Sequence, residues 1–403
     1  MRRIVIIGAG QAGLVLGLGL LRHGYAVTVV AERPAAEVLA GRLISNQCVF
    51  HPALVREREL GINFWDDRAI PVETVSFTAP GMSWQAPLDQ PAQSVDQRVK
   101  VADWMAEFTR RGGELRLHRV TPDELEPYAR EFDLVVVAAG RGPQFDQLFP
   151  RNPELSPHTQ PRRSIGVLYV RGGTPQPGLS FALGPHGECF GLPILSVDGP
   201  VYGAGIFAVP GGPLDRWDDI TDAHAHLARA QQLMREHFPW QGGILDGTEP
   251  AGPLEFLHGR ITPVVRHPVG TLPSGALVLA MGDTAVTNDP LSGQGANMAA
   301  HAARSYEEAI VAHGDRPFDA EFMHGAFARC WARAEHATRF SLDLLDPPPA
   351  HVMSTLDTAQ RVPEVAHRFA QLFANPVDYT GWLTEETAAL DYLAAASARA
   401  AAQ

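Results

Sequence analysis

The pattern Gly8-x-Gly10-x-x-Gly13 constrains the fold more than any other feature of the chain. It follows a short β-branched run, residues 4–7, which is typical of a strand buried on both faces of a parallel sheet. A leucine- and alanine-rich stretch, residues 11–22, follows the first glycines and predicts a helix. In this setting Gly8 permits a tight turn, Gly10 admits a pyrophosphate, and Gly13 lets helix and strand pack closely. The chain therefore begins like a dinucleotide-binding fold.

A second strand, residues 26–30, completes the predicted βαβ unit, and Glu32 stands at its end. A carboxylate about twenty residues after the glycines is placed to accept hydrogen bonds from the ribose of an adenosine. Arg33 could touch the same ribose or be solvated, and we favour the solvated interpretation. For the whole unit the alternative is a glycine-rich turn without a ligand, which the flanking strand and helix disfavour.

Length and charge exclude several classes of partner. The 403 residues exceed what one hydrophobic core usually organises, so we expect two domains. A formal net charge of −12, without any Lys- or Arg-rich run, disfavours binding to nucleic acid and to membrane surfaces. Every apolar stretch is interrupted before the roughly 20 residues that a membrane span requires.

Cysteine and histidine spacing argues against disulfides and metal sites. Cys48, Cys189 and Cys330 are far apart and form no CxxC pair, which predicts neither a disulfide framework nor a structural zinc. The histidines show no HExxH or other ligand spacing, so no metal is predicted. A reducing compartment, the cytoplasm, fits this cysteine usage best.

The strand and helix patterns divide the rest of the chain into three parts. Apolar runs at 134–138 and 276–280 are typical of buried strands of the first sheet. A series of short strands between them predicts a mostly antiparallel second domain. Those short strands are 166–170, 179–183, 189–193 and 201–207. Helices are predicted at 95–111, 215–238, 290–313, 318–345, 356–373 and 385–401, with a break at Pro347-Pro348-Pro349.

A second motif bears on which dinucleotide the fold binds. Asp283 comes directly after the strand 276–280 and before the glycine-rich run 293–297, which introduces a helix. A carboxylate at the end of a strand can hydrogen-bond the ribityl hydroxyls of a flavin, which NAD lacks. The bare helix N-terminus offers positive charge where a reduced flavin is negative, at N1. The motif favours FAD, although a buried Asp that caps a helix is an equal alternative for Asp283 taken alone.

The second motif also carries a family resemblance. The run Gly282-Asp283, Asp289-Pro290 and Gly293-Gln294-Gly295-Ala296-Asn297 resembles the second flavin motif of FAD-dependent aromatic hydroxylases, and more closely that of the styrene monooxygenases. Four other segments also resemble the family and occur in the same order along the chain, at 8–14, 95–98, 187–193 and 337–340. With the strand pattern, the resemblance implies an α/β fold with a Rossmann-like FAD-binding domain, a mostly antiparallel β-sheet substrate-binding domain and C-terminal helices. The corresponding ranges are 1–160 with 268–330, 161–267 and 331–403.

The resemblance implies a set of site residues. The implied FAD contacts are Gly8, Gly10, Gly13, Glu32, Arg42, Arg98, Asp283, Pro290, Gly293, Gly295, Ala296 and Asn297. Pro290, Gly293 and Asn297, together with Asn46, are implied closest to the reaction. For Arg98 a surface helix arginine is the alternative, and the run 42–46 is locally shifted against the family pattern. The chain also departs from that pattern at Leu291-Ser292, where two apolar residues are expected, and at Val286-Thr287, where single-component hydroxylases usually carry a histidine.

The resemblance implies a flavin-dependent monooxygenase. Such proteins take reduced FAD from a separate NADH-dependent flavin reductase, and its reaction with O2 gives a C4a-hydroperoxyflavin that epoxidises or hydroxylates an aromatic alkene such as styrene or indole. A homodimer would be unsurprising. The chain has no second GxGxxG pattern, since 202–206 fails to supply one. A self-sufficient NAD(P)H-dependent aromatic hydroxylase and a non-catalytic FAD-binding sensor remain alternatives.

Overall fold

The computed structural model describes the chain except for residues 175, 176, 242 and 403. Its N-terminal unit has the predicted order of β1 (Arg3–Ile7), α1 (Gln11–Arg22) and β2 (Ala26–Ala31). Alternate residues of β1 belong to two different hydrophobic clusters, with Ile4 and Ile6 in one and Val5 and Ile7 in the other. Apolar side chains on both faces explain why β1 lies inside a parallel sheet.

The first sheet has the order β14-β15-β6-β1-β2-β5 within the described residues. All of its pairs are parallel except β14 with β15. The strand predicted late in the chain therefore returns to this sheet, because β15 pairs with β6. The remaining strands are β5 (Glu114–Leu117), β6 (Leu134–Val137), β14 (Val269–Thr271) and β15 (Leu277–Ala280).

The second sheet is mostly antiparallel, as predicted, with the order β11-β7-β10-β9-β8-β3-β4 and with β12 paired to β7. Its strands are β3 (Pro71–Ala79), β4 (Met82–Gln93), β7 (Ser164–Gly172), β8 (Leu179–Gly184), β9 (Gly187–Ser196), β10 (Gly199–Ala208), β11 (Thr248–Pro250) and β12 (Phe256–Arg260). The hairpin β3–β4 was not predicted, and β3 pairs in parallel with β8. It comes from the range assigned to the first domain, so sheet membership crosses the predicted division, which itself stays a prediction.

The helices correct several predicted boundaries. The stretch 356–373 is not one helix, because α9 ends at Ala359 and Pro363 begins α10. The helix predicted from 215 starts only at Ala223, where the Asp222 side chain caps it. The helices are α2 (Ala35–Leu39), α3 (His51–Glu59), α4 (Gln97–Arg110), α5 (Leu125–Glu131), α6 (Ala223–His237), α7 (Gly295–His313), α8 (Ala320–Asp343), α9 (Ala350–Ala359), α10 (Pro363–Gln371), α11 (Pro376–Trp382) and α12 (Glu386–Ala401).

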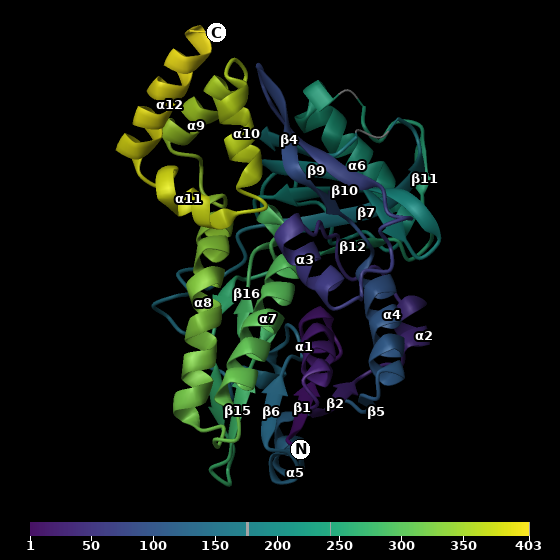
Figure 1. Cartoon of the computed structure of the whole chain (residues 1–403). Helices are drawn as coiled ribbons and strands as arrows, with labels where there is room; N and C mark the ends of the chain where they lie inside the picture. Colours follow the sequence, from purple (N-terminus) through teal and green to yellow (C-terminus); the bar gives the residue numbers. More distant parts are fainter. Residues whose placement is uncertain (175–176, 242, 403) are drawn as a thin grey trace.

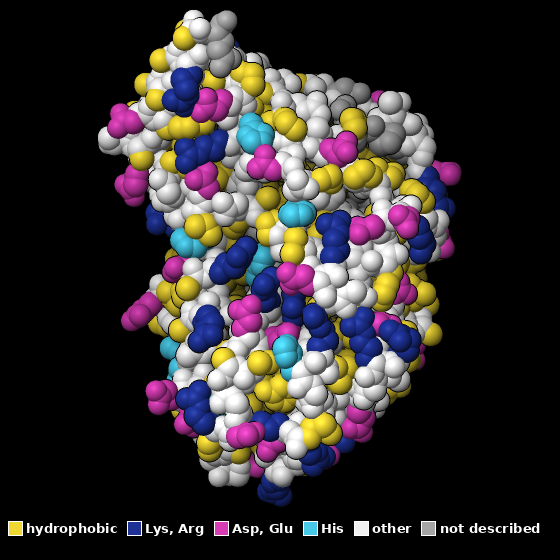
Figure 2. Space-filling view, viewed as in Figure 1, with side chains coloured by type: hydrophobic (Ala, Val, Ile, Leu, Met, Phe, Trp, Pro, Cys, Tyr) yellow, Lys and Arg dark blue, Asp and Glu magenta, His cyan; other side chains and the backbone are white. Residues whose placement is uncertain are grey.

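The two sheets occupy opposite halves of the molecule. Figure 1 shows the first sheet in the lower half with α7 and α8 beside it, and the second sheet with α9 to α12 in the upper half. α7 packs on α1 and on α8, and its amino end lies between the halves. Positive and negative side chains are intermixed over the face seen in Figure 2. Among the described helices, none combines the length and apolarity that a bilayer span requires.

Candidate functional site

The glycines of the first turn have different structural roles. Gly8 has a φ of +118°, and a Cβ there would meet the Ala138 carbonyl oxygen at 2.2 Å. A Cβ at Gly13 would meet the Gly8 carbonyl oxygen at 2.2 Å, so this glycine lets α1 pack against the turn. A Cβ at Gly10 would meet no atom of the described residues within 4 Å. Gly10 therefore leaves open space at the amino end of α1, where a pyrophosphate would lie.

Two cavities follow the carboxyl edge of the first sheet. The nucleotide cavity, of about 260 Å³, extends from the first turn to Glu32. The central cavity, of about 220 Å³, extends from the same turn to Asp283 and the amino end of α7. Gly10 and Gln97 lie in the walls of both. The two cavities thus form one elongated path, as an extended dinucleotide requires.

Glu32 lies in the wall of the nucleotide cavity with an exposed carboxylate. The Arg119 Nε atom is 3.7 Å from Glu32 Oε1, which is too long for a hydrogen bond. Arg119 therefore does not occupy the carboxylate oxygens with a hydrogen bond, and the predicted contact of Glu32 with a ribose stays a prediction. Arg33 lines the same cavity, so both interpretations of this residue stay open.

Asp283 follows β15 in a 3₁₀ turn, η4 (Gly282–Thr284), and lines the central cavity. Burial raises the pKa of this carboxyl, and the Arg141 guanidinium, whose Nε lies 3.5 Å from Asp283 Oδ2, opposes that shift. The sequence patterns missed Arg141. Its available signal was its place just after β6, at the sheet edge where the other site residues gather.

The amino end of α7 faces the central cavity. A 3₁₀ turn, η5 (Pro290–Ser292), leads to Gly293 at φ +67°, and α7 then begins at Gly295. Within the described part of the chain no side chain caps α7, so its first N–H groups are available to a ligand. Gly293, Gly295 and Ala296 line the central cavity together with Asp283 and Pro290. The geometry thus brings the two halves of the second sequence motif to one space.

Asn297 does not line the central cavity, because its amide is used inside the protein. Its Oδ1 accepts a hydrogen bond from the Phe50 backbone N–H at 2.8 Å. Its Nδ2 donates to the carbonyl oxygens of Cys48 at 2.9 Å and Gly293 at 3.0 Å. Asn297 thus ties the segment 48–50 to the turn that begins α7, so its side chain positions the site.

Asn46 presents the opposite situation. Its Nδ2 and Oδ1 atoms are buried and have no hydrogen-bond partner among the described residues. The residue lines the central cavity and also a third space, the apolar cavity. A buried amide without partners is costly, and a ligand that pairs with it would recover that cost. Asn46 is therefore the predicted reaction-side residue with the most freedom to contact a ligand.

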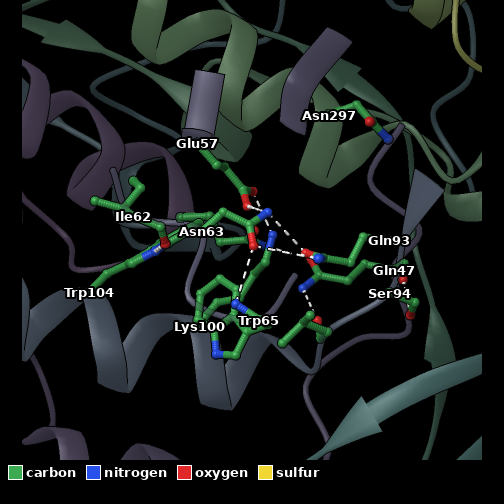
Figure 3. A network of polar contacts seen from close by, with 12 residues as sticks. Gln47, Glu57, Ile62, Asn63, Trp65, Gln93, Ser94, Lys100, Trp104 and Asn297 are labelled. Carbon is green, nitrogen blue, oxygen red and sulfur yellow. Dashed lines mark hydrogen bonds and ion pairs between the residues drawn. The ribbon is translucent and has the colours of Figure 1, made fainter. Parts of the chain in front are cut away.

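A polar network holds the loop that carries Asn46 (Figure 3). Gln47 accepts a hydrogen bond from Gln11 Nε2 at 2.6 Å and donates to the Val95 carbonyl oxygen at 2.6 Å. Ser94 Oγ donates to the Gln47 carbonyl oxygen at 2.6 Å. Gln11 and Gln47 line the central cavity; Gln11 occupies a variable position of the first glycine motif, and neither was predicted as a site residue. Because the loop is held from several sides, the cavity wall is formed before any ligand arrives.

The apolar cavity, of about 130 Å³, lies between the central cavity and the second sheet. It shares Asn46, Arg141, Pro290 and Gly293 with the central cavity. The rest of its wall is mainly hydrophobic, with Ile165, Val167, Leu179, Phe181, Phe190, Leu192 and Phe207 from the second sheet and Leu291 from the turn before α7. Such a space suits a small apolar molecule held against whatever fills the central cavity.

Four predicted cofactor residues lie outside the walls of both the nucleotide and the central cavity: Gly13 and Asn297, already described, and Arg98 and Arg42. Arg98 is buried and donates to Asp96, to Glu255 Oε2 at 2.6 Å and to the Gly41 carbonyl oxygen at 2.8 Å. Arg42 places its guanidinium 5.3 Å from the centre of the Phe256 ring. Gln97, the neighbour of Arg98, lines both cavities instead.

The residues along the path fit FAD. An open glycine lies where the pyrophosphate would bind, and a carboxylate lies at each of the two positions that a ribose and a ribityl chain would reach, Glu32 and Asp283. The unpartnered amide of Asn46 and the uncapped amino end of α7 supply polar contacts for a flavin ring. This donor set matches a flavin dinucleotide better than NAD, which has no ribityl chain.

Comparison with known proteins agrees with this geometry. Residues 140–242 match the family model named for the substrate-binding domain of styrene monooxygenase A. Styrene monooxygenase StyA of Pseudomonas fluorescens is 31% identical over 395 residues, 93% of this chain and 93% of that protein. A second StyA, from a Pseudomonas species, is also 31% identical over the same shares of both chains.

Solved structures share the fold at much lower identity. The flavin-dependent brominase Bmp2 gives a TM-score of 0.67 at 14% identity, covering 93% of this chain and 90% of that one. The tetrameric form of 2-methyl-3-hydroxypyridine-5-carboxylic acid oxygenase gives 0.63 at 16% identity, covering 94% and 98%. These likenesses support the predicted fold class. The family is shown by the 31% identity to StyA over 93% of the chain. The chain belongs to the styrene monooxygenase family and is an FAD-dependent monooxygenase.

Proposed function

We propose that this chain is the oxygenating component of a two-component system, which uses reduced FAD and O2 to oxygenate a small aromatic alkene such as styrene or indole. The observation that carries the proposal is that the central and apolar cavities share Asn46 and Arg141 in their walls. A flavin ring in the central cavity would therefore face an apolar space of small size. The StyA relatives are named for styrene, which supports this substrate class.

The proposed cofactor contacts follow the path of the cavities. The first turn, with Gly8, Gly10 and Gly13, would receive the pyrophosphate, and Glu32 the adenosine ribose. Asp283 would accept hydrogen bonds from the ribityl hydroxyls. The backbone at Pro290, Gly293, Gly295 and Ala296 would meet the pyrimidine side of the ring, where a helix amino end stabilises negative charge. Asn297 would position this turn through its hydrogen bonds to Phe50, Cys48 and Gly293.

Three further residues would act in other ways. Asn46 would hydrogen-bond at the junction of the flavin and the alkene, because its amide has no other partner among the described residues. Arg98 supports the Gly41 carbonyl, and so would position the neighbouring loop rather than contact FAD. Arg42, over the ring of Phe256, would have a similar indirect role.

Reduced FAD, when bound, supplies the electrons that activate O2 for transfer of one oxygen atom to the alkene. The chain itself would hold the alkene double bond against the ring and exclude water from the apolar cavity. Hydrophobic side chains such as Val167, Leu179 and Leu192 perform both tasks. Such a site depends on orienting the alkene and excluding water more than on an acid–base pair of side chains.

A separate NADH-dependent flavin reductase would supply the reduced FAD. The sequence has no second GxGxxG motif for a nicotinamide dinucleotide, which supports a separate source of electrons. The same proposal places the enzyme in the cytoplasm, where its free and buried cysteine thiols would stay reduced.

The decisive experiment supplies the purified, FAD-loaded protein with electrons either from NADH or NADPH alone or from NADH with a flavin reductase. With NADH or NADPH alone we expect the flavin spectrum to stay oxidised and styrene to remain unchanged. With a flavin reductase and NADH we expect oxygenated product from styrene or indole. Rapid bleaching of the flavin by NADPH alone would instead indicate a self-sufficient hydroxylase, and tight FAD binding without any product would indicate a sensor.

A further inference from the structure

A second, larger apolar space lies behind the apolar cavity. This rear chamber, of about 550 Å³, is enclosed by strands of the second sheet and by helices α8 to α10. Its wall includes Phe77 and Trp84 from β3 and β4, Phe181 from β8, Phe340 from α8 and Phe373 after α10. The proposed oxygenation does not require it.

The chamber wall is rich in aromatic rings that already pack on one another. Phe181 stacks on Phe373 with the ring centres 5.0 Å apart, and Phe77 stacks on Trp84 at 5.5 Å. Phe340 meets Phe373 edge-on at 5.5 Å. The Trp84 indole N–H is buried without a hydrogen-bond partner among the described residues. Such a wall favours a flat aromatic ligand, which can add to the same stacked and edge-on contacts.

The charged side chains of the wall are already paired, which disfavours an ionic ligand. Arg163 donates to Glu188 at 2.7 Å. Asp343 lies 3.5 Å from the Arg339 Nε atom and also accepts a hydrogen bond from the Tyr379 hydroxyl at 2.6 Å, and Asp346 is paired with Arg162. A charged ligand would lose its hydration and find no free counter-charge in these groups. The chamber is therefore suited to a neutral aromatic molecule.

The chamber adjoins the apolar cavity on one side and the protein surface on the other. Phe181 and Leu291 lie in the walls of both spaces and so form the partition between them. The chamber wall also includes Val209, which is 43% exposed, and the exposed Pro347 in the link between α8 and α9. The wall therefore contains residues that reach solvent as well as the two that border the apolar cavity.

Bound FAD would obstruct one approach to the apolar cavity. The apolar cavity shares Asn46, Arg141 and Gly293 with the central cavity, so a flavin there would close that side of the apolar cavity. We propose, given the function proposed above, that the rear chamber is an antechamber: it binds a neutral aromatic molecule and passes it beyond Phe181 into the apolar cavity. The substrate then arrives from the second-sheet side while the flavin stays in place.

A crystal soak tests occupancy directly. Crystals of the FAD-loaded protein are soaked in 4-bromostyrene, and the bromine is located by anomalous scattering. We expect one bromine position in the apolar cavity and a second in the chamber, next to Phe77 and Trp84. Bromine in the apolar cavity alone would overturn the proposal. The soak needs no catalysis, so it reads the chamber even if the proposed oxygenation fails.

A pair of tryptophan variants tests passage. Val352 on α9 lines the chamber, and Val352→Trp would fill part of it. Ser354→Trp, on an exposed position of the same helix, is the matched control. With reductase present we expect Val352→Trp to raise the KM for styrene roughly tenfold, with kcat and FAD affinity little changed. The control should keep the KM of the unmodified protein.

The two experiments separate the outcomes. Equal KM values for the two variants would show that substrate does not pass through the chamber, and bromine there would then reflect binding at crystal concentration only. If Val352→Trp does not fold, Val352→Phe, which adds less volume, gives the same comparison. Absence of any oxygenated product from the unmodified protein would count against the proposed function, and the soak alone would then decide the chamber.

Discussion

The two ends of the proposed cofactor path are built in different ways. At the nucleotide end, the glycines and Glu32 come from one βαβ unit within the first 32 residues. At the flavin end, the turn before α7 is fixed by groups far along the chain: Ser292 bonds to Ser341, and Gln294 Nε2 donates to the Phe373 carbonyl oxygen at 2.9 Å. The residues proposed to bind the pyrophosphate and the ribose are thus close together in the sequence, whereas the turn at the flavin end is held by groups from distant segments.

The largest expected effect is a loss of stability when the Asn297 side chain, which links the segment 48–50 to the turn before α7, is removed. Asn297→Ala would leave the Phe50 N–H and two carbonyl oxygens without their partner, so we expect the free energy of unfolding to fall by about 3 kcal/mol. Urea denaturation measures it. Asn46→Ala is the matched control: it breaks no hydrogen bond within the described residues and should cost little stability while lowering styrene oxygenation. Equal stability of the two variants would contradict the distinction drawn between these asparagines.

Asp283→Ala should weaken FAD binding by about 2 kcal/mol, or roughly thirtyfold, because the cavity wall loses the carboxylate that would accept ribityl hydrogen bonds. Titration of the apoprotein with FAD, followed by flavin fluorescence, measures the dissociation constant. An unchanged constant would remove Asp283 from its proposed role and place the flavin end elsewhere.

Asp289 should make stability depend on pH. The residue is fully buried, its Oδ1 accepts from the Leu291 N–H, and burial raises its pKa from 3.8 to about 7. Between these two values the folded protein keeps a proton that the unfolded chain releases, so stability falls as pH rises from about 4 to 7. Asp289→Asn should flatten that slope, by an amount on the order of 1 kcal/mol across the window. Urea denaturation at a series of pH values measures the free energy of unfolding of both proteins. The same pH dependence in the two would contradict this prediction.

Glu32→Gln should have the smallest effect, about a threefold loss of FAD affinity, because Glu32 is exposed and its hydrogen bonds compete with water. The same fluorescence titration measures it. A loss larger than that of Asp283→Ala would reverse the comparison and make the nucleotide end dominant.

The difference between the ends also explains what could be predicted from sequence. The first turn and Asp283 carry motifs tied to a single strand and helix, so both could be located. Arg141 and Gln47 reach the central cavity from loops whose paths no short pattern encodes. Gln11 stands at a variable position of the first motif, so the motif does not specify its side chain. Arg98 shows the converse, since a family position near the flavin here supports a carbonyl of the adjoining loop.

Long-range pairing limited the prediction of the fold in the same way. The hairpin β3–β4 lies inside the first half of the chain but joins the second sheet through β8, a hundred residues later. Pro87 and Pro91 within β4 also weaken its strand signal. Helix boundaries failed where a proline restarts a helix, as at Pro363.

The bond from Gln294 to the Phe373 carbonyl has a consequence for biosynthesis. Translation proceeds from the amino end, so a growing chain has its nucleotide turn early but cannot complete the flavin turn until residue 373 has left the ribosome. We therefore expect FAD to be loaded after nearly all of the polypeptide has been made. Shortened products that end before residue 373 would lack the partner of Gln294 and so the complete flavin turn.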